Sequence, residues 1–269
     1  MNNLRLTIAY DGTRFAGWQI QPGLPTIQGE IQEAFFRLTG EKVTAHSAGR
    51  TDAGVHALGQ VASIRTTSNL PLERILMGMQ HFLPEEIVVR RVERVPLDFH
   101  PAFSSRRKTY RYVMLSSLLR EPFLRRFAWR VRPGLDDSAM RRAAAFLEGR
   151  HDFRCFETQG SPRADTVRTL FSVRVRRGGV WPLLDASAQP MEDPGGPCVT
   201  IEVTGDGFLY NMVRAITGTL YEVGIGKRDV ASVGRLIADG DRTLAGQTAP
   251  ARGLFLVHVD YGTETDTVD

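Results

Sequence analysis

The sequence is poor in cysteine, which excludes folds held together by disulfides or by structural zinc. Cys155 and Cys198 are the only cysteines in 269 residues, and neither belongs to a CxxC pair. Two isolated cysteines cannot build a disulfide framework or a usual four-ligand zinc site. Because small secreted domains depend on such cross-links, we expect this chain to work in a reducing cytoplasm.

Long apolar runs are also missing. No stretch approaches the roughly 20 apolar residues that a membrane-spanning helix needs. The residues from Met1 to Arg5 lead straight into a strand-like pattern, so we expect neither a signal peptide nor a membrane partner. With 42% hydrophobic and 24% charged residues, the composition is that of a folded globular protein, which at this length can bury one large core or two modest ones.

Lysine is scarce, whereas arginine is abundant. Lys42, Lys108 and Lys227 are the only lysines, which leaves 31 arginines among the 34 basic residues (34 − 3 = 31). The planar guanidinium suits phosphate groups and stacks on bases, but a GC-rich genome would enrich arginine as well. The net charge of +4 is too small to decide between an RNA partner and this neutral explanation.

Motifs for cofactors and metals are absent from the sequence. Gly226-Lys227 lacks the Ser or Thr that follows in a phosphate-binding P-loop, and Gly224-Ile225-Gly226 is too short for a dinucleotide fingerprint. The six histidines are scattered, with no pair at metal-ligand spacing. We therefore predict no cofactor and no metal, so that side chains alone would have to carry any chemistry.

The first hundred residues predict a β-α-β-β-α-β order, the split arrangement of ferredoxin-like folds. Apolar residues alternate in the strand segments and recur at helical spacing after Thr26, which can cap a helix that Gly40 closes. The expected elements are a strand at 4–10, the helix after Thr26, strands at 42–47 and 58–65, a helix that Pro71 opens and that runs through Phe82, and a strand at 86–95.

The second half repeats this order. The expected elements are a strand at 105–115, a helix capped by Asp136 or Asp137 and ended by Gly149, strands near 167–177 and 198–203, helices at 208–223 and 229–238, and a last strand at 254–261. Glycine and proline in the stretch 178–197 predict a loop that extends a hairpin, and the acidic tail 264–269 predicts a frayed end.

Together the two patterns predict an α+β fold. We expect two ferredoxin-like halves, residues 1–103 and 104–269, that share one continuous antiparallel sheet and leave a central cleft between their helical layers.

The best candidate for chemistry is the segment from Gly49 to His56, where two glycines bracket a polar turn between two strand signals. Glycines let the backbone bend sharply and let another molecule come close. Asp52 at its centre could be a functional carboxylate. It could equally be a turn residue that caps its own backbone, since Asp-x-Gly turns are common.

The same segment resembles the signature of the TruA-type tRNA pseudouridine synthase family. Other segments match that family in the expected order, so that the resemblance runs from about Leu4 to Tyr261. The matching segments are Ala48-Gly49-Arg50-Thr51-Asp52-Ala53-Gly54-Val55-His56, Tyr10-Asp11-Gly12 with Phe15-Ala16-Gly17-Trp18-Gln19, Asp98-Phe99-His100-Pro101-Ala102-Phe103, Lys108-Thr109-Tyr110-Arg111-Tyr112, Gly149 with His151-Asp152-Phe153, Gly207-Phe208-Leu209-Tyr210-Asn211-Met212-Val213-Arg214 and Gly253-Leu254-Phe255-Leu256.

The resemblance implies two ferredoxin-like halves on a shared sheet and isomerisation of uridine to pseudouridine in the anticodon arm of tRNA, at positions 38 to 40. In this reaction the N1–C1′ bond breaks, the uracil rotates while it stays bound, and the base rejoins through C5. No redox change or group transfer is involved, which agrees with the absence of cofactor motifs. The resemblance also implies a homodimer in which one tRNA touches both subunits.

The resemblance further implies a set of site residues. Asp52 would be the catalytic carboxylate, attacking C1′, attacking C6 or taking a proton from C2′. Arg50 and Arg214 would hold it ionised, because a neighbouring positive charge favours the carboxylate, and Arg50 could also fill the gap that an extruded base leaves. Tyr110 would stack on the uracil once it has left its helix. The plainer interpretations are a core aromatic for Tyr110 and a phosphate contact or surface residue for Arg214. For Tyr112, Trp18 and Phe208 we expect packing.

Two basic clusters, Arg106-Arg107-Lys108 and Arg125-Arg126, have aromatic residues nearby. They could follow RNA phosphates, or they could form an ordinary solvated face. Two other functions compete with the synthase. One is a non-catalytic tRNA-binding or chaperone protein on the same scaffold. The other is a small-molecule hydrolase that would require Asp52 and His56 to face each other.

Overall fold

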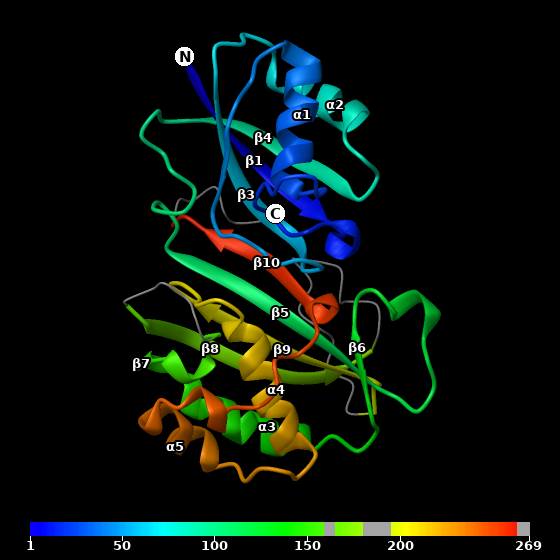
Figure 1. The fold of residues 1–269 in the computed structure, drawn as a ribbon, viewed down its shortest axis with the longest axis vertical. Coiled ribbons are helices and arrows are strands. Elements are labelled where there is room, and N and C mark those ends of the chain that lie inside the picture. The colour runs from blue at the N-terminus through cyan, green and yellow to red at the C-terminus, as the bar shows by residue number, and fades with distance from the viewer. Residues whose placement is uncertain (159–164, 180–194, 263–269) are drawn as a thin grey trace. The chain divides into compact units, whose positions relative to one another are not determined.

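A computed structural model describes residues 1–158, 165–179 and 195–262 of the chain (Figure 1). In these ranges it is an α+β protein with five α-helices and ten strands. The chain divides into two compact units, Met1–Arg106 together with the chain from Leu256 onward, and Arg107–Phe255. Most of the predicted hairpin loop 178–197 and the acidic tail 264–269 lie outside the described residues.

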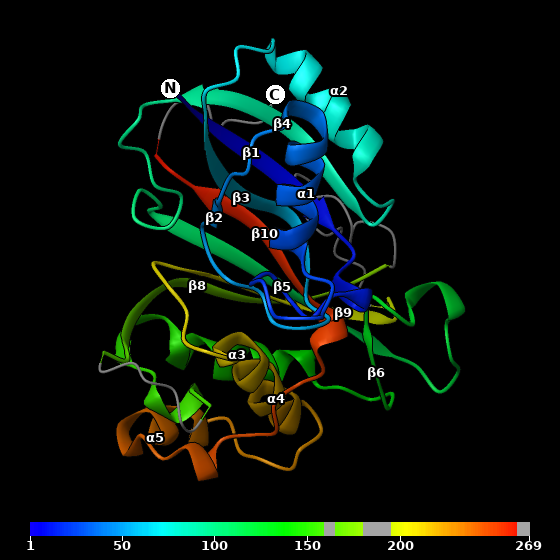
Figure 2. The same ribbon diagram turned by 45° about the horizontal axis from the view of Figure 1, so that its top comes forward.

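Unit 1 has the β-α-β-β-α-β order that its periodicity predicts. Its strands are arranged β4-β1-β3, and both β2 and the late strand β10 also pair with β3. Helices α1 and α2 pack side by side, as Figure 2 shows. The elements are β1 (Asn2–Tyr10), α1 (Ile27–Thr39), β2 (Ala45–Ser47), β3 (His56–Thr66), α2 (Leu72–Phe82), β4 (Ile87–Val95) and β10 (Leu254–Asp260).

The two faces of β1 are used differently. Leu4, Leu6 and Ile8 are buried almost completely on one face and form part of the core. On the other face Arg5 lies opposite Glu93 of β4, and the two side chains form an ion pair of 2.8 Å. Alternation along this strand therefore separates an apolar face from a polar face, on which Arg5 is paired with Glu93.

The caps of α1 follow the sequence signals. The Thr26 hydroxyl accepts a hydrogen bond from the backbone N–H of Gly29, and Gly40 closes the helix in the left-handed conformation with φ 76°. Helix α2 begins at Leu72, so Pro71 is its N-cap residue and not the first helical residue that we predicted. The proline nitrogen has no hydrogen to donate, and either position at a helix start tolerates it.

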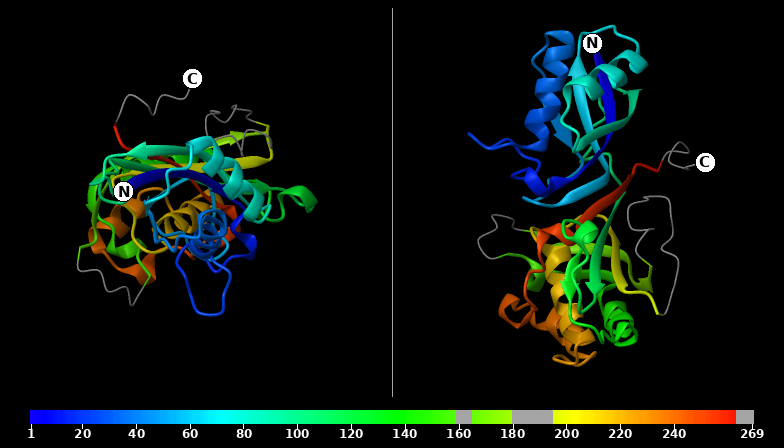
Figure 3. Two further views of the ribbon diagram at one scale, coloured as in Figure 1. Left: turned by 90° about the horizontal axis from the view of Figure 1, so that it is seen from above. Right: turned by 90° about the vertical axis from the view of Figure 1, so that its right-hand side faces the viewer.

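Unit 2 has the strand order β5-β9-β8-β7, with β6 pairing in parallel with β5. Helix α3 packs against both α4 and α5, and these three helices are seen from two further directions in Figure 3. The elements are β5 (Arg107–Ser116), β6 (Trp129–Val131), α3 (Asp137–Ala144), β7 (Gly149–Asp152), β8 (Val167–Gly178), β9 (Cys198–Gly205), α4 (Met212–Gly224) and α5 (Ser232–Asp239).

Several details of unit 2 differ from the prediction. Helix α3 ends at Ala144 and a 3-10 turn follows through Leu147, so Gly149 begins β7 and does not end the helix as predicted. The prediction did not include strands β6 and β7, because three or four residues are too few to show an alternating pattern. Helix α4 begins at Met212 and not at Phe208, because Asn211 has φ 61° and cannot continue a right-handed helix. Consequently Arg214 lies in the first turn of α4.

Candidate active site

The loop of residues 48–55 between β2 and β3, here called the catalytic loop after the role proposed for it below, carries Asp52 and Arg50. Strand β2 pairs with the far part of β3, from Ala62 to Ile64, so the loop forms the end of a long hairpin. Asp52 is half-buried, and Arg50 is exposed. The sequence therefore places one carboxylate at the surface of unit 1 with an arginine two residues before it.

A tight turn follows Asp52. The backbone N–H of Val55 donates to the carbonyl oxygen of Asp52 at 3.1 Å, and Gly54 has φ 76°, as the third residue of a type II turn requires. The turn interpretation of Asp52 is thus correct for its backbone. However, the hydrogen bond that closes this turn uses the carbonyl oxygen of Asp52 and not its carboxylate.

A second loop, residues 11–26, here called the supporting loop, packs directly on the catalytic loop. The backbone N–H of Trp18 donates to the Thr51 carbonyl at 3.0 Å, and the backbone N–H of Gly54 donates to the Phe15 carbonyl at 3.3 Å. Gly17 has φ 96°, and a Cβ atom on it would lie only 2.6 Å from the Thr51 oxygen. Only glycine allows this close approach of the two backbones.

Buried polar side chains hold the catalytic loop from the side of the sheet. The Tyr10 hydroxyl and the Thr51 hydroxyl are 2.7 Å apart, and Gln60 Nε2 donates to the Gly49 carbonyl at 2.8 Å. Burial raises the pKa of Tyr10 to about 12, although its hydrogen bonds with Thr51 and Gln60 oppose the rise, so the hydroxyl stays protonated at neutral pH. These hydrogen-bonded side chains were not predicted from the sequence. The only indication of them there is Gln60, a polar residue within the otherwise apolar strand β3.

His56 is a structural residue at the start of β3. Its ring is 1% exposed, and its Nδ1 atom lies 3.0 Å from the Gly12 N–H and 3.2 Å from Asp11 Oδ1. A hydrogen bond from Gly12 requires an unprotonated Nδ1, whereas a hydrogen bond to Asp11 requires a protonated Nδ1. The tautomer of His56 therefore decides which of the two bonds forms. In either tautomer the ring is too buried to meet a substrate. This argues against a hydrolase that uses Asp52 with His56.

Asp11 is held as a carboxylate by its neighbours. Its burial would raise the pKa, but the neighbouring His56 ring and hydrogen bonds from the hydroxyl and backbone of Thr13 outweigh this effect. The pKa of Asp11 therefore lies well below its ordinary value. Gly12 beside it contacts the backbone of Val55 so closely that a Cβ atom would overlap the Val55 oxygen.

In unit 2, Tyr110 lies on β5 opposite Val203 of β9. Its side chain is 8% exposed, and its ring packs against that of Phe208 in a T-shaped arrangement with centroids 4.9 Å apart. Tyr112, two residues on, is fully buried and donates from its hydroxyl to the Pro250 carbonyl at 2.7 Å. Burial keeps the pKa of Tyr112 far above its ordinary value. Tyr112 is therefore a packing residue, as expected.

Arg214 is half-buried in the first turn of α4, and its guanidinium is fixed by two hydrogen bonds. Nε donates to the Ala249 carbonyl at 2.7 Å, and Nη1 donates to Asn211 Oδ1 at 2.6 Å. Asn211 is in turn bonded to the Thr158 hydroxyl at 2.8 Å. The left-handed Asn211 thus both starts the helix and orients the arginine.

The four predicted site residues are divided between the units. Asp52 and Arg50 belong to the catalytic loop of unit 1, and Tyr110 and Arg214 belong to unit 2. Their assembly into one site is a prediction.

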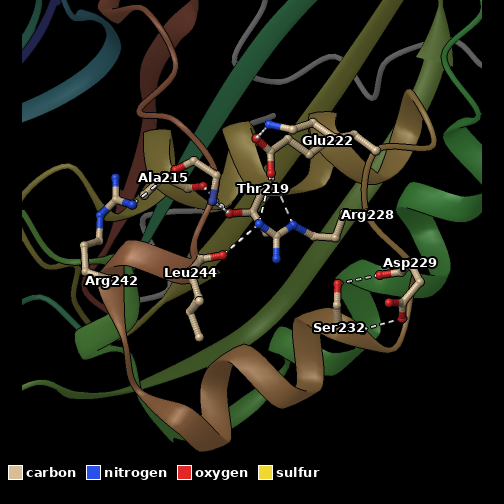
Figure 4. Close-up of polar contacts among 10 residues, drawn as sticks. Ala215, Thr219, Glu222, Arg228, Asp229, Ser232, Arg242 and Leu244 are labelled. Atoms are coloured by element: carbon tan, nitrogen blue, oxygen red, sulfur yellow. Dashed lines mark hydrogen bonds and ion pairs between the residues drawn. The ribbon is translucent and has the colours of Figure 1, made fainter.

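Other features of the described residues do not compete with this site. A search of residues 1–158, 165–179 and 195–262 finds no cluster of three His, Cys, Asp or Glu that could hold a metal ion. No helix in the same ranges is long and apolar enough to cross a membrane. A cavity of about 560 Å³ lies along α4 and α5, and none of the four site residues lines it. Beside this cavity Glu222 forms ion pairs with Arg228 (Figure 4) and with Lys227.

Comparison with known proteins gives the family. The pattern described as "tRNA pseudouridine synthase" matches residues 6–104 and 143–262. The chain belongs to the tRNA pseudouridine synthase family. Members are isomerases, so the enzyme converts uridine to pseudouridine, with tRNA as its substrate.

Curated relatives cover almost the whole chain. The tRNA pseudouridine synthase A of Citrifermentans bemidjiense is 43% identical over 267 residues, which are 99% of this chain and 100% of that protein. The proteins of the same description from Moorella thermoacetica and Brevibacillus brevis are each 43% identical, over 96% and 97% of this chain and 99% and 100% of their own lengths.

Among solved structures, a chain from the archaeal box H/ACA sRNP Nop10-Cbf5 complex matches 98% of this chain and 50% of its own length. It is 11% identical with a TM-score of 0.35, which is too weak a likeness to inform the fold.

The contact between Gly17 and the catalytic loop generates a first prediction. Replacing Gly17→Ala should destabilise the enzyme by about 1–3 kcal/mol, because the new Cβ meets the Thr51 oxygen and the φ is unfavourable. It should also lower kcat by up to about 100-fold, since the catalytic loop must shift. Urea unfolding and pseudouridine formation on a tRNA transcript measure the two effects.

Gly23 offers the matched control for this experiment. It has φ 73° in the same supporting loop, but no atom lies within 4 Å of a Cβ placed there. Gly23→Ala should therefore lower the free energy of unfolding by only about 1 kcal/mol, the cost of a positive φ for alanine, and should leave kcat unchanged. Equal kcat values for the two variants would show that the Gly17 contact does not position the loop.

Asp11 generates a second prediction, on pH. Because its folded pKa is depressed, its contribution to stability is complete above the unfolded pKa of about 3.9 and is lost as the pH falls toward the folded pKa. Asp11→Asn should therefore be less stable than the natural protein at pH 6, and the difference should shrink at pH 3. Urea midpoints at both pH values test this, and a constant difference would contradict it.

Proposed function

We propose that the enzyme isomerises uridines in the anticodon stem-loop of tRNA, at positions 38 to 40, with Asp52 as the catalytic carboxylate. One observation carries this proposal. The backbone on both sides of Asp52 is fixed by hydrogen bonds at Gly49, Thr51 and Gly54, while Asp52 itself remains half-exposed. A catalytic carboxylate needs this combination of fixed position and access to substrate.

The proposed reaction balances within the uridine itself. The N1–C1′ bond breaks, the uracil turns, a C5–C1′ bond forms, and the proton lost from C5 is balanced by one gained at N1. An ionised Asp52 could attack C1′, attack C6 or take the proton from C2′. All three routes need the carboxylate form, and none needs a cofactor.

Arg214 is proposed to keep Asp52 ionised. Its guanidinium is oriented by Ala249 and Asn211 before substrate arrives, so it can act as a fixed positive charge beside the carboxylate. An opposite charge within about 4–6 Å lowers a carboxylate pKa by roughly 1–3 units. Arg50 is exposed in the same loop as Asp52, which suits the proposed role of filling the space left by an extruded base.

Tyr110 is proposed to stack on the extruded uracil. Its ring already packs against Phe208, so little side-chain freedom would be lost when the base binds. Base flipping costs a few kcal/mol, and stacking on an aromatic ring offsets part of that cost.

The proposal also covers the arrangement of the whole enzyme. Two ferredoxin-like halves would share one antiparallel sheet, and the cleft between them would bring Asp52 and Arg50 to Tyr110 and Arg214. We further propose a cytoplasmic homodimer in which one tRNA contacts both subunits.

Asp52→Asn is the decisive variant. It removes the charge but keeps the size of the side chain, so the variant should bind tRNA with near-natural affinity and form no measurable pseudouridine. Pseudouridine mapped by chemical labelling of a tRNA transcript measures the product. Asp239→Asn, an exposed aspartate at the end of α5, should retain full activity.

The same assay distinguishes the alternatives. Substantial product from Asp52→Asn would refute the role of Asp52. A natural protein that binds anticodon arms but leaves every uridine unchanged would instead be a non-catalytic tRNA-binding or chaperone protein.

Arg214→Gln tests the electrostatic part of the proposal. Without the positive charge the carboxylate should take up its proton more readily, so the acidic limb of the pH–kcat profile should move to higher pH by about one unit or more. Arg235→Gln removes an exposed arginine that pairs only with Asp229 among the described residues, and it should leave the profile unchanged. An unmoved acidic limb in Arg214→Gln would exclude this role.

A further inference from the structure

Phe103 has the highest exposed fraction, 87%, of the large apolar side chains in the described residues. It lies in the segment between β4 and β5, within a tight turn of residues 100–105. The Ser104 N–H donates to the His100 carbonyl at 2.8 Å, and the Ser105 hydroxyl donates to the Ala102 carbonyl at 2.9 Å. The ring is therefore held outward by an ordered turn, at an obvious cost in exposed apolar surface.

Phe103 is the outer member of a column of three rings. Its centroid lies 4.4 Å from that of His100 at an interplanar angle of 30°, and His100 lies 5.5 Å from His46 at 44°. His46 is exposed on β2, so the column joins two segments that are far apart in the sequence. We call these three residues the ring column.

Positive charge lies beside the ring column. Arg65 is exposed on β3 and its Nη2 atom donates to the Leu97 carbonyl at 3.0 Å, which ties it to the segment that carries His100. Partial burial is the main cause that lowers the pKa of His100, and His46 and Arg65 add to it. The His100 ring is therefore neutral at physiological pH and presents a flat face like that of Phe103.

We propose that the ring column is a stacking platform for an unpaired base of the tRNA, other than the target uridine, with Arg65 on the adjoining phosphate. Aromatic rings next to an arginine are the combination that single-stranded nucleic acid binds, because every base has a flat face and every nucleotide a phosphate. A protein partner would need a continuous apolar surface, whereas Ser104, His46 and Arg65 make the surroundings of Phe103 polar.

The ring column is also close enough to the proposed site to serve the same RNA. His46 precedes Asp52 by six residues, and six extended residues span at most about 22 Å. A strand that delivers a base to Asp52 would therefore pass within a few nucleotides of the column. This inference rests on the proposed function and adds a second contact for the same substrate.

Substitutions of Phe103 test the platform through the affinity for an unmodified tRNA transcript, measured by fluorescence anisotropy. Phe103→Ala should weaken binding roughly 5- to 150-fold, the range expected for one base stacked on one aromatic ring. Phe103→Leu should weaken it similarly, because it keeps apolar bulk without a ring. Phe103→Trp should bind as the natural protein does. Met77→Ala, which truncates another exposed apolar side chain of unit 1 on α2, should have no effect.

Kinetics separate the platform from the catalytic machinery. Phe103→Ala should raise KM and leave kcat at saturating tRNA unchanged, whereas Asp52→Asn abolishes kcat. A binding constant within twofold of the natural value, or full binding by Phe103→Leu, would overturn the proposal. So would a change in oligomeric state of Phe103→Ala in sedimentation velocity, which would make the column a contact between copies. If the natural protein forms no pseudouridine but the Phe103 series weakens tRNA binding as expected, the proposed reaction fails and the platform stands.

Discussion

Thr51 is the residue on which the geometry of the catalytic loop depends, because it is hydrogen-bonded through both its side chain and its backbone. Its hydroxyl meets Tyr10 at the end of β1, and its carbonyl accepts from Trp18 in the supporting loop. The peptide that joins Thr51 to Asp52 cannot rotate without breaking one of these bonds. A fixed backbone of this kind supplies positioning in advance of substrate binding, and such positioning can account for a large part of an enzyme's rate.

Three buried polar side chains lie in or beside this loop. Gln60 is fully buried, His56 is 1% exposed and Thr51 is 6% exposed, yet each has a hydrogen-bond partner. An unpaired polar group at such depth would cost about 1–3 kcal/mol, so the network tolerates few alternative arrangements. These three buried side chains therefore help to hold one turn in place, whereas the side chains proposed to carry the chemistry lie nearer the surface.

The sequence predicted what depends on local periodicity and capping. The order of elements in unit 1 and the caps of α1 at Thr26 and Gly40 were confirmed, because long alternating or helical patterns and capping residues act over a few positions. The short strands β6 and β7 could not be predicted, nor could the left-handed Asn211 that delays α4 to Met212. The contacts of Tyr10, Thr51 and Gln60 were also out of reach, since they join residues up to 50 positions apart. Only the family resemblance distinguished Asp52, as a candidate catalytic carboxylate, from an ordinary turn residue.

The placement of β10 joins β3 of unit 1 to a strand that lies far along the sequence. The side chains and backbone groups described above that hold the catalytic loop lie between Tyr10 and Gln60, so they can come together while the rest of the protein is still being synthesised. The strand that completes the sheet of unit 1, however, is β10, and Gly59 of β3 lies so close to Val257 that a Cβ atom would be 2.5 Å from its oxygen. Part of the β3 edge therefore stays unpaired until β10 has been synthesised, and an unpaired strand edge is prone to aggregation.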